Sequence, residues 1–218
     1  MTLVEELKRV VERVTGRGRP SRRDFRLLLR KVKPTALVFT DDGRTPNSPL
    51  PLLHYRQAVR AHEDFDAAAV LEEVFAAHGW KDSWRNGIYR HLHFHTGTHE
   101  VLGIARGQAR VQFGGSKGKV VPLIAGDVVV LPAGTGHKRL SGSRDLLVVG
   151  AYPPRGEYDE PGPDKVSHEE ALERIAKVPL PRQDPLYGGE GPLPKRWSRR
   201  RRRGAPRPTS APRGARKK

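Results

Sequence analysis

Short strands separated by tight turns fill residues 88–153, and this pattern constrains the fold more than any other feature of the chain. Turn-forming residues interrupt the stretch at 106–108, 114–118, 125–127, 133–136 and 141–143. Such spacing is typical of an all-β barrel or sandwich, in which inward side chains alternate along every strand. A small barrel of this kind has room inside for one compact ligand.

The length of the chain and its lack of cysteine narrow the possibilities. With 218 residues, the chain is long enough for one well-buried domain with appendages. Without cysteine it has no disulfides, thiolate zinc sites or cysteine nucleophiles, so a metal would find only nitrogen and oxygen donors. Glu5 and Glu6 interrupt the apolar run that a secretion signal needs, and no segment is apolar enough to span a membrane. We therefore expect a soluble, cytoplasmic protein.

The positive charge of the chain is concentrated at its two ends. Residues 1–33 carry a net charge of +7 and residues 195–218 a net charge of +12, out of +17 for the whole chain. Residues 34–194 have a net charge of −2, so the predicted barrel is not itself basic. From residue 198 onward the apolar period is lost, and self-repelling charge predicts disorder.

Three parts of the chain follow from these patterns. They are a basic helical extension at 1–33, a barrel domain at 34–197 with helices at 66–77 and 167–177, and a disordered basic tail at 198–218. The extension is expected to form two amphipathic helices, the second capped by Ser21 with Asp24, which pack on the barrel or bind a partner. The first strands are expected at 36–40 and 52–55. The Pro- and Gly-rich stretch before Trp197 is expected to wrap the domain in extended form.

Histidines gather in one segment of the predicted barrel, HLHFHTGTHEVLGIARG. Four of the nine histidines of the chain fall between His91 and His99. On a strand alternate side chains share a face, so His93 and His95 would present their imidazoles on one side, roughly 7 Å apart. Two neutral imidazoles on one face are suited to binding a metal ion.

The third donor of this segment is Glu100 or His99. A flat strand would turn His99, rather than Glu100, toward the face of His93 and His95. However, Gly97 lies between them, and a glycine inside a strand often marks a bulge that resets which face is which. We therefore favour Glu100 as the ligand and keep His99 as the alternative.

A fourth donor comes from the segment GDVVVLPAGTGH. Its strand ends at Pro132 and turns through Gly134 and Gly136, which brings His137 back toward the barrel interior. Three histidines and one glutamate would then converge on one site.

The spacing of these residues resembles the cupin superfamily. The first cupin motif is matched by Gly87, His93, His95, Glu100 and Gly107, and the second by Gly126, Pro132, Gly134 and His137. The wider cupin pattern has an asparagine, which is not a ligand, where this chain has Ser141. Over residues 36–197 the chain looks like the YjlB-like branch of small cupins, through FTDDGRTPNSPLP, WRNGIY, HEVLGIARG and PAGTGHKRLSGSRDLLVVGAYP.

This resemblance implies a single cupin (RmlC-like jelly-roll) barrel, a bound metal and, as is common in the family, a homodimer. One divalent transition metal (Fe, Mn, Ni, Co, Cu or Zn) is the expected cofactor, because donor type alone does not choose among these ions. Such a site suits a metal-dependent oxidoreductase of the dioxygenase type or an isomerase, acting on a small polar metabolite. His91 and His99 are candidates for proton transfer or for a structural role beside the ligands.

Three further residues have both a functional and a structural interpretation. Trp80 and Trp84 either line the barrel mouth or simply pack. Arg85 either binds an anionic substrate or is an ordinary surface arginine without a specific role.

The alternative function is a non-catalytic cupin module that senses a small ligand or a metal. Its basic ends, above all residues 198–218, would then tether it to nucleic acid through nonspecific phosphate contacts. The charge of the tail favours such contacts, whereas the tail lacks interleaved aromatic residues and any known binding fold. No helix-turn-helix is evident beside the barrel, which counts against a sequence-specific regulator. A metal-free structural barrel is the third possibility.

Overall fold

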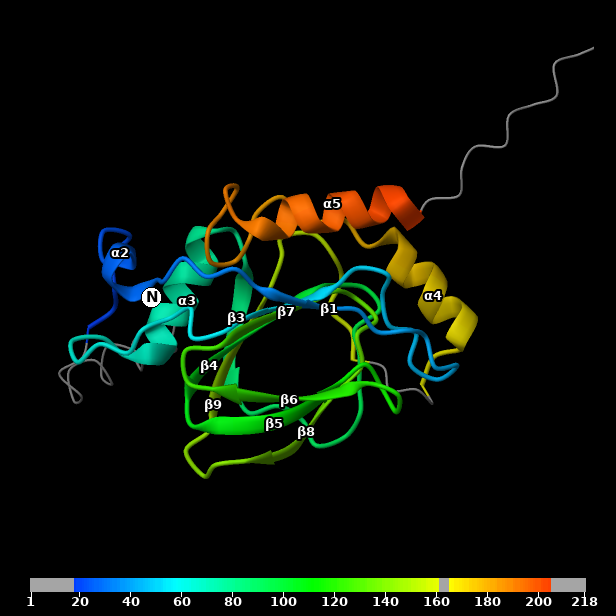
Figure 1. The fold of residues 1–218 in the computed structure, drawn as a ribbon, viewed down its shortest axis with the longest axis horizontal. Coiled ribbons are helices and arrows are strands. Elements are labelled where there is room, and N and C mark those ends of the chain that lie inside the picture. Colours follow the sequence, from blue (N-terminus) through cyan, green and yellow to red (C-terminus); the bar gives the residue numbers. More distant parts are fainter. Residues whose placement is uncertain (1–17, 161–164, 205–218) are drawn as a thin grey trace, which may run out of the picture.

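The computed structural model describes residues 18–160 and 165–204, and Figure 1 shows their arrangement. The strands are β1 (Thr35–Leu37), β2 (Leu52–Tyr55), β3 (Lys81–Asn86), β4 (Glu100–Arg106), β5 (Gln108–Phe113), β6 (Lys119–Ile124), β7 (Val128–Leu131), β8 (His137–Gly142) and β9 (Leu147–Tyr152). The helices are α2 (Phe25–Leu28), α3 (Ala67–Ala77), α4 (His168–Lys177) and α5 (Pro192–Gly204).

The strands form two antiparallel sheets that face each other. One sheet has six strands in the order β1-β2-β7-β4-β9-β3, and the other has three in the order β6-β5-β8. Strands adjacent in space are often distant in the chain. For example, β7 pairs with β2 on one side and with β4 on the other. This order is that of a jelly-roll barrel, which confirms the predicted all-β cupin fold.

The central strands of the six-stranded sheet are buried on both faces. All four residues of β7 are buried, as are the first six of β4. One face packs against the three-stranded sheet, with Leu102, Val129 and Val148 among the buried residues. The other packs beneath α3 and α5, through residues such as Val101 and Val130. Continuous apolar runs are expected of a sheet covered on both sides.

The three-stranded sheet buries only its inner face. Along β5 and β6, exposed and buried side chains alternate, so that Val111, Phe113 and Leu123 point into the barrel. Val120 and Ile124 of β6 are 42% and 38% exposed on the outer face. The period of two residues that predicts a half-buried strand is therefore clear only in this sheet.

The two helices expected inside the barrel domain begin at the expected caps. The Asp66 carboxylate accepts a hydrogen bond from Ala69 N at 3.1 Å, and α3 follows directly. Ser167 Oγ likewise accepts from Glu170 N at 3.2 Å at the start of α4. Each side chain satisfies a backbone N–H that has no partner within the helix, which fixes where the helix begins.

The second helix expected in the N-terminal extension is shorter than its sequence predicts. The first expected helix lies outside the described residues, and the second is one turn long, α2. Asp24 does accept hydrogen bonds from Ser21 N and Oγ, at 2.7 and 2.8 Å. The helix ends early because Arg30 N donates to Ala58 O at 2.8 Å, which pulls the chain into a bridge with the barrel. Leu28 is fully buried, so this segment packs on the barrel.

The C-terminal segment is helical where the sequence predicts extended structure or disorder. Helix α5 runs across residues 192–204, along the outer side of the six-stranded sheet (Figure 1). Pro192 occupies a position that favours helix starts, and Leu193 and Trp197, one turn apart, are fully buried. The prediction of extended structure is therefore wrong for residues 192–197. Helix α5 also includes the first residues of the expected basic tail, 198–204, and residues 205–218 lie outside the described part of the chain.

Candidate metal centre

A single β-bridge holds His93 beside His137. His137 N donates to His93 O at 2.9 Å, and His93 N donates to His137 O at 3.3 Å. Their rings lie 4.0 Å apart. The expected strand through residues 91–95 is wrong in detail, since this bridge is its only ladder contact among the described residues. Gly134 N instead donates to His95 O at 2.7 Å, which ties the segment to the turn before β8.

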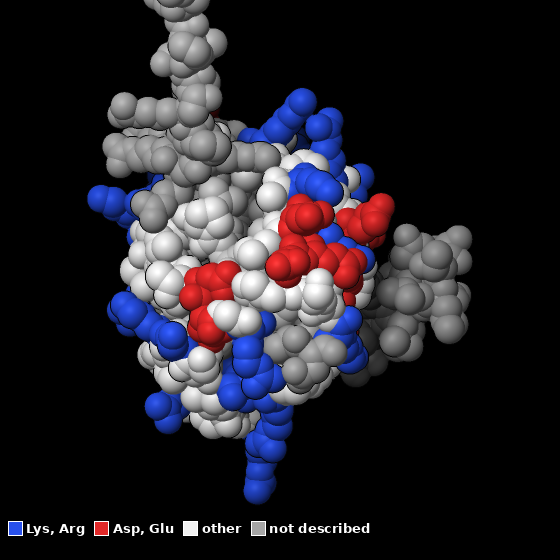
Figure 2. Space-filling model, turned by 90° about the vertical axis from the view of Figure 1, so that its right-hand side faces the viewer, with Lys and Arg blue, Asp and Glu red and all other residues white. Residues whose placement is uncertain are grey.

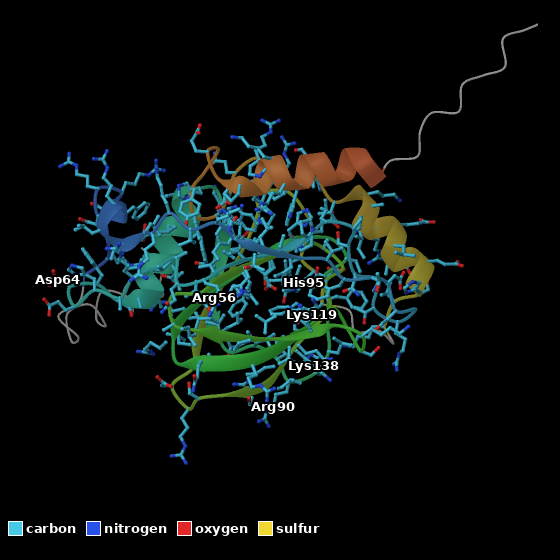
Figure 3. All side chains as sticks on the ribbon, in the orientation of Figure 1. Arg56, Asp64, Arg90, His95, Lys119 and Lys138 are labelled. Carbon is cyan, nitrogen blue, oxygen red and sulfur yellow. The ribbon has the colours of Figure 1, made fainter. Side chains whose placement is uncertain are left out.

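The four expected donors converge inside the barrel. The ligand nitrogens of His93, His95 and His137 lie within 4.8 Å of one another, and all three residues are buried. Glu100, the first residue of β4, places Oε2 at 3.3 Å from His95 Nε2 and 3.4 Å from His137 Nε2. Figure 3 shows His95 in the barrel interior, between the two sheets.

Hydrogen bonds orient each imidazole in the same way. The Nδ1 atom of His137 lies 3.0 Å from Thr135 O, that of His93 lies 3.4 Å from His91 O, and that of His95 contacts Asp159 O. A carbonyl oxygen only accepts, so in the neutral rings these contacts favour a proton on Nδ1. Nε2 is then left with its lone pair, as a metal ligand requires.

Two polar atoms of this cluster are buried without a hydrogen bond. They are His95 Nε2 and Glu100 Oε2, whose contact at 3.3 Å has no hydrogen-bond geometry. An unsatisfied buried polar group costs about 1–3 kcal/mol, so native structures seldom keep one without a reason. The donor set, three imidazole nitrogens and one carboxylate, fits a divalent transition metal.

Burial and mutual contact shift the protonation of these groups. Burial, together with the neighbouring His137 and His95, lowers the pKa of His93 to about 3. Burial also disfavours the charged form of His95, but the Glu100 carboxylate outweighs it and raises the pKa of His95 to about 9. Burial opposes ionisation of Glu100, yet His95 and His137 hold its pKa well below the usual range. The metal-free centre at neutral pH is therefore a buried ion pair flanked by a neutral imidazole.

The alternative ligand, His99, points away from this cluster. Its Nδ1 accepts a hydrogen bond from Ala133 N at 2.9 Å, and its ring packs 4.7 Å from the ring of Trp197 on α5. The bend at Thr96 and Gly97 resets the faces, so Glu100 turns inward. His91 is exposed and stacks on Tyr89 at 4.8 Å, with its ring 5.5 Å from that of His93.

A cavity of about 230 Å³ opens beside the donors. Its lining includes the donors His93, Glu100 and His137 and four aromatic side chains: Trp84, Tyr89, Tyr152 and Tyr158. Trp84 Nε1 donates a hydrogen bond to Tyr152 Oη at 2.9 Å. Burial and the nearby Glu100 raise the pKa of Tyr152, so its phenol stays protonated.

The structure separates the functional and structural interpretations of Trp80, Trp84 and Arg85. Trp84 lines the cavity, whereas Trp80 is buried outside it and donates from Nε1 to Gln183 O at 3.1 Å. Arg85 lies at the cavity wall, but its guanidinium is paired with Glu72 at 2.8 Å and Asp66 at 2.9 Å. We interpret Arg85 as a brace between β3 and α3.

Several residues at the site were not anticipated from the sequence. Tyr152 and Tyr158 form the cavity wall with ring centroids 5.0 Å apart, and Asp159 contacts the His95 loop. Tyr152 is the last residue of β9. Its position at the end of a predicted strand could have indicated that it lies at the barrel mouth. Tyr158 and Asp159 follow the last strand in a segment without periodicity, so the sequence carries no local signal for them.

Comparison with known proteins gives one close relative. No family model matches the chain. Over 160 residues it is 42% identical to the uncharacterized protein YjlB of Bacillus subtilis (strain 168), a match that covers 73% of this chain and 93% of YjlB.

Solved structures give only distant likenesses. The chain is similar to acireductone dioxygenase from Bacillus anthracis, with 20% identity, a TM-score of 0.29, and coverage of 39% of this chain and 59% of that one. For oxalate decarboxylase of Lactobacillus farciminis the identity is 19%, the TM-score 0.30 and the coverage 44% and 33%. For NovW, a sugar epimerase of Streptomyces spheroides, the identity is 16% and the TM-score 0.35, and the match covers 62% of this chain and 76% of NovW. The first two matches span less than two thirds of those chains, and the strand order, rather than these likenesses, defines the fold.

Proposed function

The chain belongs to the same protein family as YjlB of Bacillus subtilis, and from this premise we propose that it is a metal-dependent cupin enzyme acting on a small polar metabolite. One observation carries the proposal: three buried imidazoles converge within 4.8 Å, with a buried carboxylate oxygen beside two of them. Packing alone does not require four such groups to share one point.

His93, His95, Glu100 and His137 would hold the metal, because each offers an inward donor atom. Fe, Mn, Ni, Co, Cu and Zn all accept this donor set. When bound, such an ion polarises a substrate oxygen or activates water, which suits a dioxygenase-type oxidation or an isomerisation.

The cavity limits the substrate to a small molecule. Its volume of about 230 Å³ is below the roughly 300–1,000 Å³ of pockets for drug-sized ligands. Tyr152 can donate a hydrogen bond to a ligand there, because burial keeps its phenol neutral. The aromatic wall formed by Trp84 and Tyr158 would shield the reacting atoms from water.

Elemental analysis of freshly purified protein tests this proposal. We expect close to one transition metal per chain, and loss of that metal in both His93→Ala and His137→Ala. His62→Ala is the matched control, since this histidine contacts Asp64 and Phe65 away from the cavity and should leave the metal content unchanged. Wild-type protein that stays metal-free after reconstitution with each of the six ions would reject the proposal.

The other expectations remain predictions. A sensing module tethered to nucleic acid depends on residues 198–218, and the structure describes no side chain in that tail beyond residue 198. Figure 2 shows acidic and basic side chains close together on the α4 side of the molecule, so this face has no uniform positive charge. Within the described ranges, every helix is too short or too polar to cross a bilayer. The homodimer likewise remains a prediction.

A further inference from the structure

A short segment after β9 crosses the loop that carries His95. This segment, residues 156–160, is called the strap below. Glu157 N donates to Gly97 O at 3.0 Å, which ties the strap to the loop backbone. The Asp159 carboxylate accepts hydrogen bonds from Thr96 N at 2.8 Å and from Gly97 N at 3.1 Å, and also from Thr96 Oγ1. Two segments more than 60 residues apart in the chain thus share one hydrogen-bond network.

The same residue that fastens the loop also holds the imidazole. The backbone oxygen of Asp159 accepts the hydrogen bond from His95 Nδ1. The side chain of Asp159 therefore fixes the loop that carries His95, while its carbonyl fixes the tilt and tautomer of the ring. Both contacts direct His95 Nε2 toward Glu100.

The other two imidazoles are held locally. His93 uses the carbonyl of His91, and His137 uses that of Thr135, each two residues earlier in the chain. The carbonyl that holds His95 lies 64 residues away. Of the three candidate ligands, His95 is thus the one whose orientation depends on a distant segment.

The strap and the loop pack closely at Gly97, where no side chain fits. A Cβ atom on Gly97 would lie 2.3 Å from Glu157 O, closer than real contacts allow. The strap also reaches the cavity, because Tyr158 lines it with its ring 5.4 Å from that of His95. The strap therefore touches both a metal ligand and the space for the substrate.

We infer that the strap is part of the metal centre and that Asp159 is a positioning residue for His95. This inference rests on the proposed function, since it concerns the affinity of the same site for its metal. Removing the Asp159 side chain would remove the hydrogen bonds from Thr96 N, Thr96 Oγ1 and Gly97 N, and the Asp159 carbonyl would be held less firmly against His95. Outer contacts of this type contribute about 10–100-fold to metal affinity.

Titration of the full-length, metal-free protein with Co²⁺ tests the inference. Affinity is measured by competition with a chelator, and the visible absorption spectrum of bound Co²⁺ reports the ligand geometry. Asp159→Ala is expected to weaken Co²⁺ binding about 10–100-fold and to shift the absorption bands. Asp159→Asn keeps an oxygen acceptor for the two backbone N–H groups and should recover part of the affinity.

Two further variants separate positioning from general loss of structure. Glu157→Ala removes an exposed carboxylate from the same strap and leaves its backbone bond to Gly97. It should bind Co²⁺ with wild-type affinity and spectrum. Thr96→Val deletes one donor to Asp159 from the loop side and should weaken Co²⁺ binding, by less than Asp159→Ala, even if the latter does not fold.

The outcomes distinguish the two proposals. Wild-type affinity and an unshifted spectrum in Thr96→Val and in folded Asp159→Ala would overturn the role of the strap and leave the metal centre standing. Wild-type protein that binds no Co²⁺ would overturn the proposed function and this inference with it. An equal loss of affinity in Glu157→Ala and Asp159→Ala would also overturn the role of Asp159. The loss would then come from removing a negative charge from the strap, rather than from breaking the hydrogen bonds of Asp159 to the loop.

Discussion

Two buried pairs of a histidine and a carboxylate in the barrel, His54 with Asp127 and His95 with Glu100, differ in their surroundings. His54 Nε2 lies 3.1 Å from Asp127 Oδ2, and both side chains are less than a tenth exposed. Asp127 also accepts hydrogen bonds from Gln57 N at 2.7 Å and Ile124 N at 3.2 Å. This carboxylate is fully engaged in joining β2 to the start of β7.

The second pair leaves atoms unused. Glu100 Oε2 lies between two imidazoles and has no hydrogen bond, and His95 Nε2 has none either. Burial beside a carboxylate is therefore common to both pairs, whereas additional histidines and polar atoms without a hydrogen bond occur only at the second. The contrast shows that donor convergence, rather than burial of a histidine, distinguishes the candidate metal site.

The largest expected effect comes from replacing each carboxylate by its amide. Glu100→Gln removes a charged donor, so metal affinity should fall by about 100-fold or more, beyond the loss typical of residues that only orient a ligand. Asp127→Asn should keep the metal affinity and lower the free energy of unfolding by about 1–3 kcal/mol, because it disturbs satisfied hydrogen bonds. Chelator competition and urea unfolding measure the two quantities. Similar metal loss in both variants would remove the distinction between the pairs.

A second effect is a pH dependence peculiar to the His95 pair. In the metal-free protein the pKa of His95 is raised to about 9, so its proton must leave before Nε2 can bind a metal. Between pH 7 and 9 the metal affinity should rise about tenfold per pH unit, with one proton released per metal. This proton also stabilises the metal-free fold, and its contribution to the free energy of unfolding is full only below the ordinary pKa of histidine. Between pH 7 and 9 that contribution should therefore be lost. Isothermal titration in buffers of different ionisation enthalpy measures the release, and a flat profile would contradict the ion pair.

The smallest effect on metal affinity should come from replacing His99, a buried histidine outside the donor cluster. His99→Ala removes the acceptor for Ala133 N and the contact with Trp197. The free energy of unfolding should fall by about 1–3 kcal/mol, the cost of an unsatisfied buried group. Metal affinity should stay within about threefold of wild type, because hydrogen-bond partners that orient no ligand contribute little. A loss as large as that of Glu100→Gln would assign His99 to the metal centre.

The fold was predictable because its signals are local. Glycines at 107, 126 and 134 adopt positive φ angles at turns, where the sequence places them. Strand β2 occupies the predicted residues, while β1 is shorter than expected because the chain leaves its pairing with β2 after Leu37. Helix α5 was missed because Leu193 and Trp197 form an apolar face too short to register as a period among prolines and arginines.

The candidate site was predictable in part. His93, His95, Glu100 and His137 converge as expected, because motif spacing and the glycine bend are readable in the sequence. The choice between Glu100 and His99 depends on the geometry of that bend, and the structure supplies it. Asp159 escaped prediction since its partner Thr96 lies 63 residues away, and no local pattern links two such positions.

The segment that carries His93 and His95 lies outside the sheet ladders, apart from its one bridge to His137. The paired strands therefore form the fixed part of the barrel. His93 and His95 lie on a segment that is held by side-chain hydrogen bonds and by the strap that follows β9. Substitutions in this segment are therefore expected to change the affinity or ion preference of the proposed metal centre without shifting the register of any strand.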